Sequence, residues 1–112
     1  MRKVLQTKPM REILYRETRV ARALGVPSKY KIINVLLRHG PMNVYDLTRK
    51  VQRSQPTVSH HLAALKKLEI VRYETKADCV YYWVKYPEEL RAILESLHAF
   101  ILRTQKGLNS ET

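Results

Sequence analysis

The chain has 112 residues, 45% of them hydrophobic, which suits one small domain. It shows no signal peptide and no apolar run of the roughly 20 residues that a membrane helix needs, so we expect a soluble, cytoplasmic protein. A single cysteine, Cys79, excludes an internal disulfide. The net charge is +11; residues 1–75 hold 16 Lys and Arg against 5 Asp and Glu, whereas residues 76–112 hold 5 of each. This uneven positive charge favours a nucleic-acid partner.

Two helices are expected in the first third of the chain, after a flexible basic segment at residues 1–9. The first runs over residues 10–24 and ends at Gly25, which we expect to adopt a left-handed cap. The second runs over residues 29–39, with Ser28 as its N-cap. It is apolar nearly all round, and we therefore expect it to be the central core helix.

Residues 43–68 predict a helix-turn-helix. Asn43 is a good N-cap for a short helix that ends near Val51, and Asp46 at its third position resembles a capping box. Ser54 is a good N-cap for a second helix that begins near Gln55. Two short helices joined by so tight a turn are typical of a DNA-binding unit whose second helix enters the major groove.

The second of these helices has two different faces. Its apolar stripe should be buried and comprises Val58, Leu62, Leu65 and Leu68. The opposite face carries short, small or hydrogen-bonding side chains, which let a helix approach base edges closely. We expect His60 to point outward and His61 to turn toward the edge of the core. An ordinary amphipathic helix with a polar outer face is the alternative, and the helix-turn-helix context argues against it.

The segment after this helix predicts a β-hairpin over residues 70–85. Apolar and aromatic residues recur with a period of two in residues 70–75 and 79–85, on either side of residues 76–78. A hairpin in this place is a wing. Its basic residues Arg72, Lys76 and Lys85 either reach DNA phosphates or the minor groove, or are merely solvated.

The last predicted helix covers residues 87–105, with acidic residues in its first turn where the helix dipole favours them. Its broad apolar face predicts a homodimer in which the first and last helices of two copies pair. Packing against its own domain is the alternative. The expected dimer-interface residues are Ile13, Val20, Leu90, Ile93, Leu94, Leu97 and Ile101.

Three motifs in this order of elements resemble the ArsR-type winged helix-turn-helix regulators: Asp46-Leu47, the run from Ser54 to Leu62, and Val80-Tyr-Tyr82. The run from Ser54 reads Ser-Gln-Pro-Thr-Val-Ser-His-His-Leu and is fairly specific for that family. The resemblance covers roughly residues 28–100. It implies a homodimeric repressor that occupies an inverted-repeat operator and is released by an inducer.

The metal sites of that family have no complete counterpart here. Its Cys-Val-Cys-Asp-Leu run corresponds to the stretch that begins at Asn43 and has Tyr45 in place of the second thiolate, so a soft metal lacks its ligands. The last helix offers only Glu95 and His98 as ligands. We therefore expect no metal, no cofactor and no enzymatic activity, and the inducer stays unknown.

The sequence thus predicts a mainly α winged helix-turn-helix domain, with a small β-hairpin, that binds double-stranded DNA. An architectural DNA-binding protein and a protein-interaction module that binds through Tyr81 and Trp83 are the alternatives. The residues expected to contact DNA are Arg53, Ser54, Gln55, Thr57, Ser59, His60, Lys67, Arg72 and Lys76.

Overall fold

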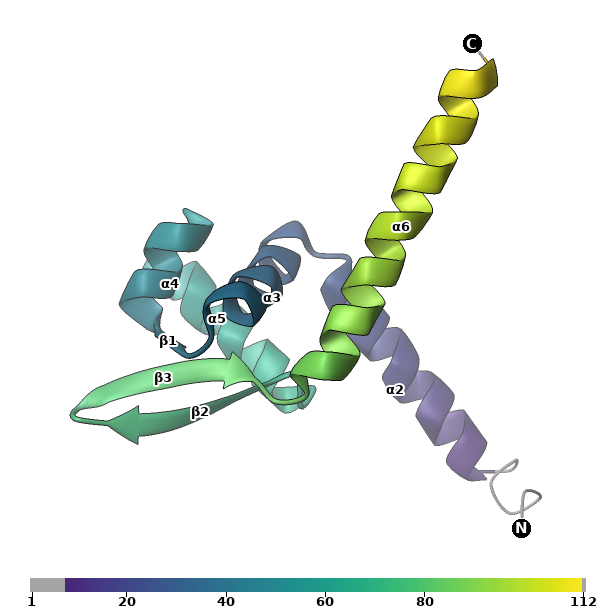
Figure 1. Cartoon of the computed structure of the whole chain (residues 1–112). Coiled ribbons are helices and arrows are strands. Elements are labelled where there is room, and N and C mark those ends of the chain that lie inside the picture. Colours follow the sequence, from purple (N-terminus) through teal and green to yellow (C-terminus); the bar gives the residue numbers. More distant parts are fainter. Residues whose placement is uncertain (1–7, 112) are drawn as a thin grey trace.

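The structure, a computed structural model, describes residues 8–111, with side chains for residues 11–105. Five helices and a three-stranded antiparallel sheet make up this part of the chain (Figure 1). The elements are α2 (Lys8–Leu24), α3 (Pro27–His39), β1 (Met42–Asn43), α4 (Val44–Val51), α5 (Gln55–Lys67), β2 (Val71–Lys76), β3 (Cys79–Val84) and α6 (Pro87–Glu111). Of the basic segment expected at residues 1–9, residues 1–7 lie outside the described residues, and residues 8–9 belong to α2.

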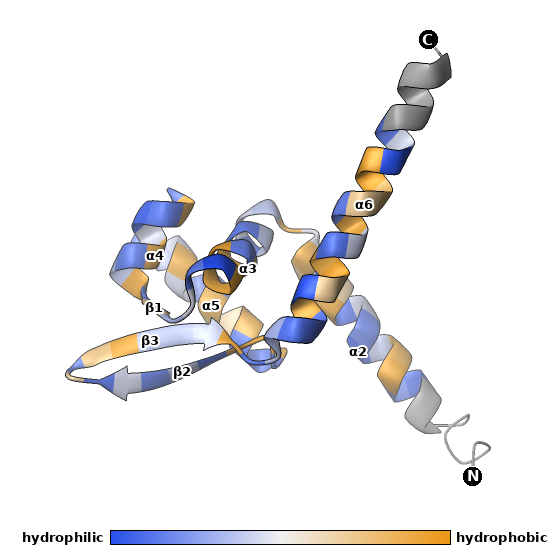
Figure 2. Ribbon diagram, in the orientation of Figure 1, coloured by the Kyte–Doolittle hydropathy of each residue, from blue (hydrophilic) through white to orange (hydrophobic). Residues whose placement is uncertain are grey.

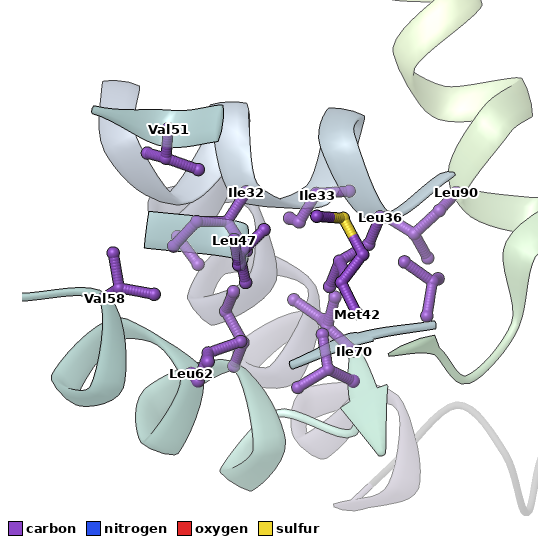
Figure 3. Close-up of a cluster of buried hydrophobic side chains, with 14 of the residues drawn as sticks. Ile32, Ile33, Leu36, Met42, Leu47, Val51, Val58, Leu62, Ile70 and Leu90 are labelled. Carbon is purple, nitrogen blue, oxygen red and sulfur yellow. The ribbon is translucent and has the colours of Figure 1, made fainter. Parts of the chain in front are cut away.

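The hydrophobic core is centred on α3, as its sequence predicts. Ile32 and Ile33 are completely buried, and Leu36 is nearly so. Figure 3 shows Leu47 of α4 and Leu62 of α5 pointing toward Ile32. Burial of such side chains is the main favourable term in folding, and here it fixes the two helices of the helix-turn-helix against one support. The other core residues are Ala23, Met42, Val51, Val58, Leu65, Ile70, Val71, Val84, Leu90 and Leu94.

The connection between α2 and α3 differs from the expected one. Gly25 does not have a positive φ; its amide donates to the carbonyls of Ala21 and Arg22, both at 3.1 Å. The chain then enters α3 with Val26 as N-cap and Pro27 in the first turn, where a missing amide costs little. Ser28 is therefore not the cap. It lies inside the helix and is buried.

The wing is a hairpin of β2 and β3, in register from Val71 opposite Val84 to Lys76 opposite Cys79. Its turn consists of Ala77 and Asp78, both with positive φ (52° and 65°), as a tight hairpin turn requires. The sheet has a third strand that the sequence did not predict. Strand β1 pairs with β3, with Met42 opposite Tyr82, and two residues are too few to show a period of two.

Helices α2 and α6 project from the body of the protein in different directions (Figure 1). Apolar residues recur along both helices (Figure 2). Leu90 and Leu94, in the first two turns of α6, are buried in the core of their own chain. These two residues are therefore not free to form a dimer interface. Helix α6 runs past the expected end at residue 105, to Glu111. None of the described helices is long and apolar enough to cross a membrane.

Candidate DNA-binding surface

Helix α4 begins at its predicted cap and ends at the predicted residue, Val51. The Asn43 side chain accepts a hydrogen bond from the amide of Asp46 at 2.8 Å. The helix ends at Gln52, which adopts the left-handed conformation (φ 63°) and donates its amide to the carbonyl of Thr48. This conformation turns the chain sharply, so that α5 can begin only three residues later.

The N-terminus of α5 is held by two hydroxyl groups. Ser54 Oγ accepts from the amide of Thr57 at 3.3 Å and donates to Thr57 Oγ1 at 2.9 Å. Pro56 occupies the first turn. Pro56 has no amide, and the amide of Val58 donates to the carbonyl of Ser54 at 3.0 Å, so the first turn leaves the amide of Gln55 to an acceptor from outside. The dipole of the helix favours an anion there. A DNA phosphate is such an acceptor.

The two faces of α5 are as different as the sequence predicts. Val58, Leu62 and Leu65 are completely buried. The expected DNA contacts on this helix are exposed, except for Thr57, which is half-buried. They form a surface of short polar groups bordered by basic residues, which consists of Arg53, Ser54, Gln55, Thr57, Ser59, His60 and Lys67. The surface has the chemistry to donate to and accept from base edges and phosphates.

The two adjacent histidines of α5 have different surroundings. His60 is exposed, whereas His61 is half-buried and its Nε2 lies 2.7 Å from Ser28 Oγ. Burial is the largest cause that lowers the pKa of His61, and the positive charges of Lys29, His60 and Arg53 add to it. His61 is therefore more readily neutral than an exposed histidine.

The basic residues of the wing are not equivalent. Arg72 and Lys76 are exposed and form no salt bridge within residues 11–105. Lys85 instead pairs with Glu69 at 2.5 Å. The hydrogen bond between them lowers the pKa of Glu69 and raises the pKa of Lys85. Because its charge is already paired, Lys85 is a weaker candidate for a phosphate contact than Arg72 or Lys76.

Three further basic residues of α4 and α5 are exposed, and the sequence did not single them out as DNA contacts. Arg49 and Lys50 are exposed in the last turn of α4, and the Arg49 guanidinium lies 5.7 Å from the centre of the Tyr45 ring. Lys66 of α5 lies 4.6 Å from the ring centre of Tyr73 on the wing. The first helix of such a unit crosses the DNA backbone, and this rule could have pointed to Arg49 and Lys50.

A second surface is apolar and lies along α2 and α6. Its exposed members include Ile13, Ile93, Leu97 and Ile101, and Val20 is half-buried. Between the two helices lies a shallow hollow of about 460 Å³, lined mostly by aliphatic side chains: Ile13, Arg16, Glu17, Val20, Ala21, Leu24 and Ile93. Nothing within residues 11–105 covers Leu97 or Ile101. Phe100 and Leu102 are also exposed, at 60% and 51%.

The residues considered as metal ligands do not form a complete set. Asn43 serves as a helix cap, Tyr45 is exposed, and Glu95 and His98 are exposed on α6. Among the described residues, no group of three or more His, Cys, Asp or Glu lies close enough together to hold a metal ion. Cys79, half-buried at the start of β3, is a free thiol.

A three-helix core with a helix-turn-helix, followed by a β-hairpin, defines a winged helix-turn-helix DNA-binding protein. The family model for bacterial regulatory proteins of the arsR family matches residues 27–73, from the start of α3 into the wing. The arsenic resistance transcriptional regulator ArsR1 of Pseudomonas putida is 31% identical over 90 residues, which cover 79% of this chain and 70% of ArsR1. The chain belongs to the ArsR family of transcriptional regulators.

Two further proteins are similar to this chain, one in sequence and one in fold. The transcriptional repressor SdpR of Bacillus subtilis is 35% identical over 63 residues, which cover 56% of this chain and 69% of SdpR. The homodimeric winged helix-turn-helix domain of Mb0332 from Mycobacterium bovis superposes with a TM-score of 0.77 at 22% identity, over 88% of this chain and 93% of that domain. At this low identity, the likeness to Mb0332 shows the fold.

Proposed function

We propose that this regulator is a homodimeric repressor that binds an inverted-repeat operator in double-stranded DNA. The observation that carries the proposal is the outer face of α5, where short hydrogen-bonding side chains stand in place of the long acidic and basic residues of an ordinary surface helix. A basic protein of net charge +11 gains affinity for any DNA, but only a face of this kind distinguishes base pairs.

The contacts divide by chemistry. Gln55 and Ser59 are assigned to base edges, because both are exposed and Gln can pair bidentately with adenine. Thr57 and His60 are assigned to bases or phosphates. The remaining residues, Arg53, Ser54, Lys67, Arg72 and Lys76, are assigned to the phosphate backbone, which positions the protein without reading sequence.

Dimerisation and repression rest on two arguments. The uncovered apolar surface of α2 and α6 supports a two-fold dimer, and Mb0332 has a homodimeric domain of the same fold. SdpR is a repressor, and a dimer bound over a promoter blocks transcription. The incomplete ligand sets near Asn43 and on α6 favour an inducer other than a soft metal. We assign the protein to the cytoplasm, without a catalytic role, since its partner is DNA.

The organisation that we propose is one domain. A basic N-terminal segment precedes α2, residues 43–68 form the helix-turn-helix, residues 70–85 form the wing, and α6 contributes to the dimer. In this arrangement, the helix-turn-helix and the wing bind DNA while the two long helices set the distance between two copies.

Selection of bound sequences from a random duplex library tests the proposal. We expect an inverted repeat with half-site centres about 10 base pairs apart, since a two-fold dimer places its recognition helices one DNA turn apart. The selected duplex should be preferred over a scrambled one by about 10³-fold or more. Binding that falls with salt and selects no sequence would instead identify an architectural protein, and no binding at moderate salt would identify a protein-interaction module.

A further inference from the structure

The one hydrogen bond within residues 11–105 that joins the side chains of two helices connects the recognition helix to the core helix. Ser28 Oγ in the first turn of α3 lies 2.7 Å from His61 Nε2 in α5, across 33 residues of sequence. Ser28 is 8% exposed and is the one polar residue among the buried side chains of residues 11–105. A buried polar contact of this kind costs desolvation and is maintained only by good geometry.

The position of His61 on α5 allows its hydrogen bond with Ser28 to fix the orientation of this helix. His61 lies between the buried stripe of Val58, Leu62 and Leu65 and the exposed face that carries Ser59 and His60. Apolar contacts are not directional, so they hold α5 against the core without fixing its rotation about its own axis. A hydrogen bond at the edge of the stripe is directional and fixes that rotation.

We propose that Ser28 and His61 are positioning residues that set the orientation of α5 for base recognition, and that they do so only while His61 is neutral. The inference rests on the proposed function. Neither residue is assigned a DNA contact. They act through Gln55 and Ser59, whose distance from the base edges changes if α5 rotates.

The unused nitrogen of His61 explains why the neutral form is required. Its Nδ1 is buried and has no hydrogen-bond partner among the described residues. The tautomer with its proton on Nε2 donates to Ser28 and leaves only a lone pair at Nδ1. Protonation would place a second N–H at Nδ1, a buried donor without an acceptor, which is costly.

The charged groups around His61 act in the same direction. Lys29 of α3, His60 of α5 and Arg53 of the turn before α5 all lower its pKa, after the larger effect of burial. The folded protein therefore has a lower pKa at this position than the unfolded chain, whose value is about 6.5. The neutral form of His61 therefore contributes fully to the free energy of unfolding above the unfolded pKa, and this contribution is lost as the pH falls toward the folded pKa.

The test compares four proteins by the ratio of their affinities for the selected operator and a scrambled duplex: the wild type, S28A, H61Q and H61L. S28A and H61L remove the contact and should lower the ratio by about tenfold, which is the discrimination lost when one base contact is misaligned. H61Q should keep it, because the Gln amide can donate from nearly the same place as Nε2. H39Q, which changes an exposed histidine at the end of α3, is the control.

The pH profile separates positioning from stability. The pH is lowered from about 8, past the ordinary histidine pKa of about 6.5, to the lowest value at which the wild type stays folded, because the pKa of His61 is below the ordinary one. The ratio should fall for the wild type and H39Q and stay nearly constant for H61Q. Circular dichroism at each pH confirms that the variants remain folded.

The outcomes are distinct. A wild-type ratio near one would reject the proposed function and, with it, the recognition that this contact is meant to orient. A large wild-type ratio that folded S28A and H61L retain would overturn the positioning role alone. Equal pH profiles for the wild type and H61Q would overturn the requirement for neutral His61.

Discussion

Replacement of Leu97 by Asp should separate the proposed dimer into monomers. Leu97 is 41% exposed on α6, and its neighbours on the stripe, Ile93 and Ile101, are 40% and 54% exposed. Full burial of such a side chain stabilises by about 1.5–3 kcal/mol, so covering the exposed part of Leu97 contributes about 0.6–1.2 kcal/mol in each copy. A two-fold interface uses the residue twice, which raises this to about 1–2.5 kcal/mol per dimer.

The L97D exchange also brings two carboxylates into an apolar interface, where each desolvated charge adds a further cost. We expect the dissociation constant of the dimer to rise by at least about 100-fold, equivalent to about 2.7 kcal/mol. Sedimentation equilibrium over a range of concentrations measures it. Operator titration should show a parallel loss of affinity, because a monomer binds only one half-site.

L102D is the matched control for this variant. Leu102 is 51% exposed on the same helix, but at 3.6 residues per turn it lies about 140° around the helix from Leu97. We expect L102D to remain dimeric. The reasoning is refuted if folded L97D dimerises as tightly as the wild type, or if L102D dissociates to the same extent.

Three other substitutions test the DNA-binding surface and its support. Q55A should cost about 1–3 kcal/mol on the operator and relax the preference at one base pair, measured by repeating the library selection; equal losses on every duplex would contradict a base contact. K76A should weaken binding to all duplexes and reduce the slope of log affinity against log salt by about 1; an unchanged slope would exclude this part of the wing from the footprint. S54A removes the cap of α5 and should lower the free energy of unfolding by about 1 kcal/mol, measured by urea denaturation. An unchanged free energy would contradict this, and would mean that water replaces the cap.

The helix-turn-helix could be predicted closely from the sequence, because its limits are set by local chemistry. The side chains of Asn43 and Ser54 cap α4 and α5 as expected, and α5 begins at the expected residue. The turn at Ala77 and Asp78 lies where the period of two was interrupted. In each case, a few consecutive residues determine the backbone, so no knowledge of the tertiary structure was needed.

The sequence was not sufficient where contacts between distant residues decide the surroundings of a side chain. Ser28 has the sequence context of a cap, but its hydroxyl finds a partner in His61, which lies far away in the sequence. Lys85 resembles other basic wing residues until Glu69 is placed beside it. Leu90 and Leu94 share an apolar face with Leu97, and only the folded chain shows that α6 leaves the core after its second turn. Packing against its own domain therefore holds for the start of α6, and the dimer interface stays a prediction for the exposed part of the helix.

The unexpected strand β1 links the helix-turn-helix to the wing, the two parts of the protein that we propose contact DNA. Asn43 is at once the last residue of β1, paired with Tyr81 of the wing, and the cap of α4. The wing cannot move independently of the helix-turn-helix without breaking this shared residue's contacts. In the proposed complex, one rigid unit reads each half-site, so a base pair inserted within a half-site would move the contacts of the wing out of register with those of α5 and lower the affinity for the operator. The two half-sites of an operator should accordingly have the same, constant length.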